Sequence, residues 1–227
     1  MGEKPILFNT QMVRAILNGS KTQTRRLIKR RYDNTVLEMK TDKYGTRLIE
    51  IQKDEEGVTF GKHEDGSTWR KLRAYIEPKP AYKAGDVLYV RETWKQATGG
   101  TAGPGLFDTI LYKADEPQDT TGLMIEERWR PSIHMPKNAA RIWLRVTNVR
   151  LQRLQDITSE DVDAEGCKEW AYSAATGELL PSAPTWFEIL WDETVSEKDK
   201  KEYGWDANPW VWAYTFERID NPREAKT

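Results

Sequence analysis

The feature that most constrains this fold is a succession of short strand-forming runs that alternate with turns rather than with helices. Residues 87–94 and residues 210–216 are the clearest runs, rich in the β-branched and aromatic residues that favour extended backbone. Helical spacing of apolar residues recurs at Thr10, at Ser159 and near residue 185. A parallel doubly wound sheet needs strict alternation of strand and helix. The pattern therefore predicts an α+β domain of about seven strands and three helices.

Two of the expected helices carry their own start and stop signals. Thr10 is expected to cap the first, and Gly19 follows its end, where a glycine commonly stops a helix. Thr158 or the residue after it is expected to cap the second, which Gly166 closes. Residues 21–28, rich in β-formers and cations, are predicted to form a strand that leaves the first helix.

Residues 32–80 differ from the rest of the chain. Short apolar pieces alternate there with glycine-containing turns, at residues 44–45, 56–57 and 65–66. That pattern favours β-hairpins on an insertion that projects from the core. The sequence shows no internal repeat. We therefore expect one domain over residues 1–219, containing this insertion, and a frayed tail over residues 220–227.

Charge and cysteine content exclude several classes of protein. The chain has 35 basic and 36 acidic residues and a formal charge of −1, so any attraction to nucleic acid must be local. One cysteine, Cys167, excludes an internal disulfide, and with two histidines it leaves too few ligands for an ordinary zinc site. No apolar run is long enough to span a membrane. We expect a cytoplasmic protein with no metal, no cofactor and no membrane partner.

Four segments form an ordered set of motifs: ILNGSKTQTRR at residues 16–26, GDVLYVRETW at 85–94, SIHMP at 132–136 and ITSEDVDAEG at 157–166. Together they resemble the ASCH (activating signal cointegrator homology) family of the PUA-like superfamily. The resemblance implies a small mixed β-barrel flanked by helices, with a cleft that takes a nucleoside or a nucleic acid. Residues 32–80 and 168–208 look like the elaborations of longer bacterial or phage-borne members.

Three residues are candidates for catalysis. Lys21 lies three residues before Thr24, and a neutral amine near a hydroxyl can activate a threonine as nucleophile. Glu165 ends a short helix, where the helix dipole disfavours an anion, so helix stability does not explain it. The resemblance to ASCH-like amidohydrolases implies that Lys21, Thr24 and Glu165 are catalytic. The alternative is a helix stop followed by a solvated edge strand, with Glu165 as a surface residue.

Further residues are candidates for substrate binding: Arg25, Arg26, Arg91, Glu92, Trp94, Ser132 and His134. Arginines suit phosphates, and a tryptophan can stack on a base. Each also has a structural explanation: Trp94 fits a core equally well, and His134 more often serves structure than catalysis. Trp210 and Trp212 share one face of a strand, which favours a place in the core over a stacking platform.

These observations leave three functions open. The first is an amidohydrolase that removes an acyl group from a modified nucleobase such as N4-acetylcytidine, with a Lys-Thr-Glu triad. The second is a non-catalytic module that binds RNA or single-stranded DNA through residues 21–31 and exposed aromatic rings. The third is a ribonuclease. The sequence has no phosphate-binding glycine loop, no paired metal carboxylates and no Ser-His-Asp pattern, which argues against a nucleotide kinase, a two-metal nuclease or an ordinary esterase.

Overall fold

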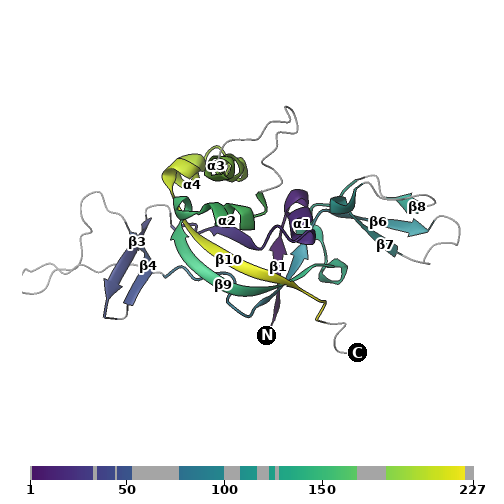
Figure 1. Ribbon diagram of the computed structural model, residues 1–227, viewed down its shortest axis with the longest axis horizontal. Coiled ribbons are helices and arrows are strands. Elements are labelled where there is room, and N and C mark those ends of the chain that lie inside the picture. The colour runs from purple at the N-terminus through teal and green to yellow at the C-terminus, as the bar shows by residue number, and fades with distance from the viewer. Residues whose placement is uncertain are drawn as a thin grey trace, which may run out of the picture.

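A computed structural model describes most of the chain, in these stretches: residues 2–32, 35–43, 45–52, 77–99, 108–116, 123–125, 128–167 and 183–222. The fold is mixed α+β, with more strand than helix (Figure 1). No helix within these stretches is long and apolar enough to cross a membrane.

A five-stranded sheet forms the centre of the molecule. Its strands, in spatial order, are β1 (Glu3–Leu7), β5 (Val87–Arg91), β9 (Trp143–Arg153), β10 (Trp210–Ile219) and β2 (Gln23–Leu27). β1 and β5 are parallel, and the other neighbours are antiparallel. Residues from the strands expected over 21–28, 87–94 and 210–216 therefore share one sheet.

The sheet is not closed into a barrel, contrary to the expectation from the sequence. β1 and β2 are its two edges, and α1 (Thr10–Leu17) is the chain that connects them. Val13 and Ile16 of this helix pack into the same core cluster as Ile6 of β1. The two edges are joined by a side-chain contact and not by a ladder of backbone hydrogen bonds. Arg26 of β2 donates a hydrogen bond to the carbonyl oxygen of Leu7 at 2.8 Å.

Local signals explain both ends of α1. The side chain of Asn9, not that of Thr10 as expected, accepts the hydrogen bond from the backbone N–H of Met12 and caps the helix. Thr10 is instead the first helical residue. Gly19, with φ of 84°, turns the chain out of the helix as expected.

Two helices cover another part of the sheet (Figure 1). α2 (Ser159–Ala164) begins at its cap Thr158 and ends before Gly166, both as expected. With α3 (Ala183–Thr194), it encloses a second core cluster that includes Val162, Phe187 and Val211. The remaining helical turns are η1 (Lys113–Asp115), η2 (Ser132–His134), η3 (Lys137–Ala139), η4 (Leu154–Asp156), α4 (Lys200–Tyr203) and η6 (Trp205–Ala207).

Two smaller sheets lie at opposite ends of the molecule (Figure 1). β3 (Thr35–Asp42) and β4 (Gly45–Gln52) form an antiparallel hairpin, whose last paired residues are Asp42 and Gly45. The rest of the expected insertion, up to residue 76, lies outside the described residues. β6 (Trp94–Gly99), β7 (Asp108–Tyr112) and β8 (Leu123–Ile125) form the other sheet.

The strand expected over residues 87–94 is two strands in the structure. β5 ends at Arg91, and β6 begins at Trp94 in a different sheet. Between them, the buried carboxylate of Glu92 accepts hydrogen bonds at 3.0 and 3.1 Å from the guanidinium of Arg141. This ion pair lies at the point where the chain leaves the main sheet.

Candidate active site

A pocket of about 250 Å³ lies where α1, β2 and α3 meet. Its wall combines polar side chains with apolar and aromatic ones: Asn9, Gln11, Met12, Thr24, Arg25, Arg26, Glu165, Cys167, Phe187, Leu190, Trp191, Glu193 and Thr194. Two of the three expected catalytic residues, Thr24 and Glu165, therefore line the same pocket.

Lys21 lies next to this pocket and contacts Glu165. Its backbone forms a β-bridge with Glu165, and its N–H donates to the carbonyl of Ala15 at 2.9 Å. The Lys21 side chain is 0% exposed. Its Nζ donates to Oε2 of Glu165 at 2.7 Å and to the carbonyl oxygen of the same residue at 2.9 Å. The pair is held by backbone as well as by side-chain contacts.

Gly166 allows this close approach. With φ of 83°, it has a backbone conformation that side-chain-bearing residues seldom adopt. A Cβ at this position would lie 2.8 Å from Cβ of Ala15 and 3.0 Å from Cβ of Lys21. Glycine therefore serves here both the helix end and the contact between Lys21 and the end of α2.

Glu165 belongs to a wider ion cluster, made of Lys21, Arg25, Arg150, Asp161 and Glu165. Arg25 lies between the two carboxylates, at 3.0 Å from Oε1 of Glu165 and 2.6 Å from Oδ2 of Asp161. Arg150 contacts Asp161 at 2.9 Å from the side nearer to solvent. The Gln23 amide also donates to Asp161 at 3.0 Å. Three cations and two carboxylates thus meet beside the pocket.

The charges in this cluster decide the ionisation of Asp161. Burial by itself would raise the pKa of this carboxyl group. Hydrogen bonds from Arg150 and Gln23, together with the charges of Arg25 and Arg150, outweigh burial and hold the pKa below its ordinary value. Asp161 is therefore a permanent anion at neutral pH.

Thr24 differs from its neighbours in having no fixed partner. It is buried and lines the pocket. Its hydroxyl makes no hydrogen bond with any residue in the described stretches, and so none with Lys21 or Glu165. In the register of the sheet it lies opposite Tyr214 of β10. The hydroxyl is thus available to a molecule in the pocket.

Arg26 and Cys167 complete the reactive groups of the wall. The Arg26 guanidinium lies 5.3 Å from the ring centre of Phe8, and burial lowers its pKa. Burial, with the charge of Glu165, raises the pKa of Cys167 to about 12. A thiol with such a pKa stays protonated and is a poor nucleophile.

Five expected binding residues do not line this pocket: Arg91, Glu92, Trp94, Ser132 and His134. Arg91 donates hydrogen bonds to the carbonyl oxygens of Ile133 and, at 2.7 Å, Met135, and so holds the η2 turn. Trp94 is buried in a third core cluster. Ser132 and His134 belong to η2, and His134 is exposed.

Glu92 is the buried partner of Arg141 rather than a wall of the pocket. Burial raises its pKa, and the contacts with Arg141 only partly offset this. Its place at the break between β5 and β6 indicates a structural role.

Sequence reasoning missed three members of the site: Gln23, Arg150 and Asp161. A signal for two of them was present. Asp161 precedes Glu165 by four residues, the spacing that puts two side chains on one helix face. Gln23 precedes Arg25 by two residues and so shares its face of the strand. Arg150 comes from β9 and had no local signal.

The chain's own groups offer no evident metal site in the described part. No set of three His, Cys, Asp or Glu side chains there is arranged to hold a metal ion. His63 lies outside the described residues.

Comparison with known proteins adds no family. No family model, no curated protein and no solved structure matches this chain.

Proposed function

We propose that this protein is an ASCH-type amidohydrolase that removes an acyl group from a modified nucleobase of the N4-acetylcytidine type. One observation carries the proposal: Thr24 and Glu165 line one pocket, and Lys21 contacts Glu165 directly beside it. We also propose that the five-stranded sheet is a PUA-like core, in which α1 fills the gap between the edge strands.

The composition of the pocket wall suits a nucleobase. Phe187, Trp191 and Met12 supply apolar and aromatic surface for a flat ring. Asn9 and Gln11 supply amides that can pair with the polar edge of such a ring. The volume of about 250 Å³ suits a small ligand rather than a large one.

The charge balance of the ion cluster supports Lys21 as the base. In the resting state the Lys21 ammonium donates to Glu165, and an ammonium cannot accept a proton. However, the cluster holds three cations against two carboxylates. If Lys21 loses one proton, each carboxylate still has an arginine partner, and the excess positive charge disappears. The proposed reaction uses Lys21 in this neutral form.

The reaction then proceeds in two stages. Neutral Lys21 takes the hydroxyl proton of Thr24 while Oγ forms a bond to the acyl carbonyl carbon. The tetrahedral intermediate then expels the exocyclic nitrogen of the nucleobase, and this nitrogen takes the proton that Lys21 received from Thr24. Water next attacks the acyl-threonine ester, and Lys21 transfers the proton of that water to Thr24 Oγ as the acid leaves. Glu165, anionic between Lys21 and Arg25, orients the amine.

A second function is favoured by one specific observation. Lys21 is fully engaged with Glu165, through both its carboxylate and its carbonyl oxygen. A lysine whose amine is engaged in this way need not act as a base, which suits a module that binds RNA or single-stranded DNA without chemistry. Such binding through several phosphates weakens by about 0.7 log unit per contact for each log unit of salt, whereas turnover of a neutral nucleoside does not.

Mass spectrometry of reaction products distinguishes the two. We expect the pure protein to convert N4-acetylcytidine, or another nucleoside from an acylated panel, into the free amine and a carboxylic acid. Lys21→Arg should be almost inactive, because a guanidinium keeps the charge but cannot act as a base. Its melting curve provides the folding control. Full activity in Lys21→Arg would rule out Lys21 as the general base. If no acylated nucleoside is turned over, the binding module is favoured.

A further inference from the structure

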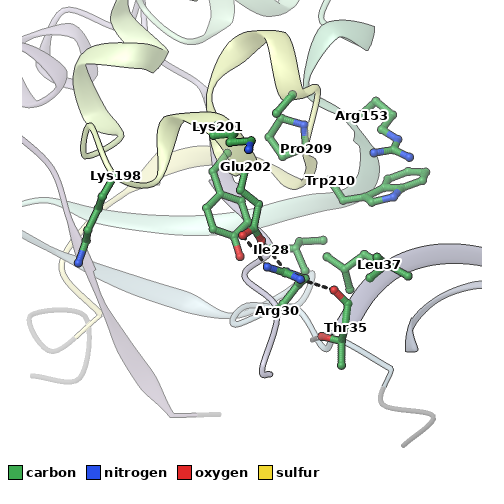
Figure 2. Close-up of a pocket in the computed structure, with 13 residues that line it drawn as sticks. Ile28, Arg30, Thr35, Leu37, Arg153, Lys198, Lys201, Glu202, Pro209 and Trp210 are labelled. Atoms are coloured by element: carbon green, nitrogen blue, oxygen red, sulfur yellow. Dashed lines mark hydrogen bonds and ion pairs between the residues drawn. The ribbon is translucent and has the colours of Figure 1, made fainter. Parts of the chain in front are cut away.

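A second and larger pocket, of about 530 Å³, lies between the β3–β4 hairpin and the segment that holds α4 and η6. Ile28 and Arg30, which follow β2, line it together with Val36 and Leu37 of β3 (Figure 2). Trp210, at the start of β10, also lines it and lies beside Arg153. This pocket shares no lining residue with the candidate active site.

Positive charge predominates in this second pocket. Among the described residues, four cationic side chains line it, Arg30, Arg153, Lys198 and Lys201, against one carboxylate, that of Glu202. Both oxygens of that carboxylate are held by Arg30 at 2.5 Å, so it is already neutralised (Figure 2). Lys198 and Lys201 are exposed and form no ion pair within the described stretches. The uncompensated charge favours an anionic ligand.

The pocket also presents an aromatic side chain, Trp210. The guanidinium carbon of Arg153 lies 4.2 Å from the ring centre of Trp210, above the indole (Figure 2). The indole N–H of Trp210 is buried and has no hydrogen-bond partner in the described part of the chain. Because protein atoms cover this N–H, Trp210 offers a ligand its ring and not a hydrogen bond.

We propose that this pocket binds a nucleotide. The phosphate meets Arg153 and Lys201, and the base packs against Trp210 and the apolar side chains of Ile28 and Leu37. The pocket itself indicates both parts of this ligand, the phosphate and the base. An inorganic anion would leave the aromatic surface without a contact, and an uncharged ring would leave the cationic side chains without one.

The ligand could be a free mononucleotide or one unit of a single strand. Residues 24–26 line the first pocket and residues 28 and 30 line the second, so consecutive parts of one segment reach both. At about 3.3 Å per residue, an extended segment from Thr24 to Arg30 spans roughly 20 Å. A short strand can cover such a distance. The proposal does not rest on the proposed hydrolysis, because the second pocket contains none of its residues.

Calorimetric titration tests the proposal with four probes: inorganic phosphate, uridine, uridine monophosphate and a short oligouridylate. We expect the monophosphate to bind at least about tenfold more tightly than phosphate or uridine, because only the monophosphate uses both halves of the pocket. Oligouridylate binding much more tightly than the monophosphate identifies a strand as the ligand. Equal affinities identify a free nucleotide. If neither uridine monophosphate nor oligouridylate binds, the proposal is wrong.

Matched variants locate the binding. Lys201→Gln removes a lining cation, whereas Lys200→Gln removes the same charge from the next residue, which pairs with Glu197 and does not line the pocket. We expect Lys201→Gln to weaken nucleotide binding about five- to tenfold and Lys200→Gln to change it less than twofold. Trp210→Ala, which removes the aromatic surface, should also weaken it. Equal effects of the two lysine variants overturn the proposal, because they would show diffuse attraction.

Thr24→Ala separates this inference from the proposed function. We expect this variant to bind uridine monophosphate as the wild type does, because Thr24 lines only the first pocket. If Thr24→Ala and Lys201→Gln weaken binding equally, the nucleotide occupies the first pocket and the second-site proposal is wrong. If the wild type hydrolyses no acylated nucleoside but Lys201→Gln alone loses nucleotide affinity, the second site stands without the first.

Discussion

The two pockets use the same kinds of charged residue in opposite ways. In the first, Lys21 and Arg25 are buried, and each contacts a carboxylate at 3.0 Å or less. In the second, Lys198 and Lys201 are exposed, and the one lining carboxylate is already taken by Arg30. Buried and paired charges fix geometry, whereas exposed charges without carboxylates attract a ligand at little cost to folding.

The largest effect should come from the residue in the first pocket that has no fixed partner. Thr24→Ala removes the proposed nucleophile, and we expect hydrolysis to fall by about 10⁴-fold or more, ~5 kcal/mol in transition-state free energy. Thr24→Ser keeps the hydroxyl and should retain measurable activity. Steady-state kinetics on an acylated cytidine measures both. Comparable rates for Thr24→Ala and wild type would exclude a covalent acyl-threonine.

The next effect compares the stability of the two pockets directly. Arg25→Ala leaves Glu165 and Asp161 buried with fewer partners, and we expect it to lower the free energy of unfolding by about 3–5 kcal/mol. Lys201→Ala removes an exposed charge and should change it by less than about 0.5 kcal/mol. Urea unfolding measures both values. Similar losses in the two variants would show that the difference in burial has no energetic meaning.

Gly166→Ala sharpens the comparison within the first pocket. The new Cβ would lie 2.8 Å from Cβ of Ala15, and φ at this residue is 83°. The steric overlap and the backbone strain would therefore both destabilise the folded protein. We expect a loss of about 2–4 kcal/mol. Gly19→Ala is the matched control, because its φ is 84° but nothing lies within 4 Å of its added Cβ. It should cost only about 1–2 kcal/mol. Equal losses in denaturant unfolding would mean that the overlap is relieved by movement.

Local sequence patterns were sufficient to predict most of the strands and helices, but not to predict whether the central sheet closes into a barrel. The strands of the central sheet and the ends of α2 follow from runs and caps that are local in sequence. Whether the edge strands β1 and β2 pair depends on tertiary packing and not on a local pattern, and Val13 and Ile16 of α1 pack in the same core cluster as Ile6 of β1. The break after Arg91 was also missed, because local patterns do not show that Glu92 pairs with Arg141, which lies 49 residues later in the chain.

The candidate site divides in the same way. Motif resemblance selected Lys21, Thr24 and Glu165, of which the structure places Thr24 and Glu165 in one pocket and Lys21 against Glu165. It did not reveal that a second carboxylate, Asp161, shares Arg25 with Glu165. Resemblance marks residues one by one, but an ion cluster is defined by how strands and helices pack.

The smallest effect we expect is the pH dependence of stability that arises from Asp161. Its pKa lies below the ordinary value in the folded protein, despite burial, because Arg150, Gln23 and Arg25 favour the carboxylate. A depressed folded pKa contributes stability that is fully present above the unfolded pKa of about 3.9. That contribution is lost as the pH falls through the folded pKa, because protons then bind the unfolded chain first.

Asp161→Asn tests this contribution, since it keeps the size of the side chain and one acceptor oxygen. We expect the wild type to be more stable than Asp161→Asn at neutral pH, and the difference to shrink as the pH falls below about 4. Unfolding free energies at a series of pH values measure it. Asp156→Asn is a suitable control, because that carboxylate accepts the backbone N–H of Arg153 outside the cluster. A difference for Asp161→Asn that stays constant down to acid pH would show that the residue contributes through packing and not through charge, and the paired-charge account of the first pocket would lose its electrostatic basis.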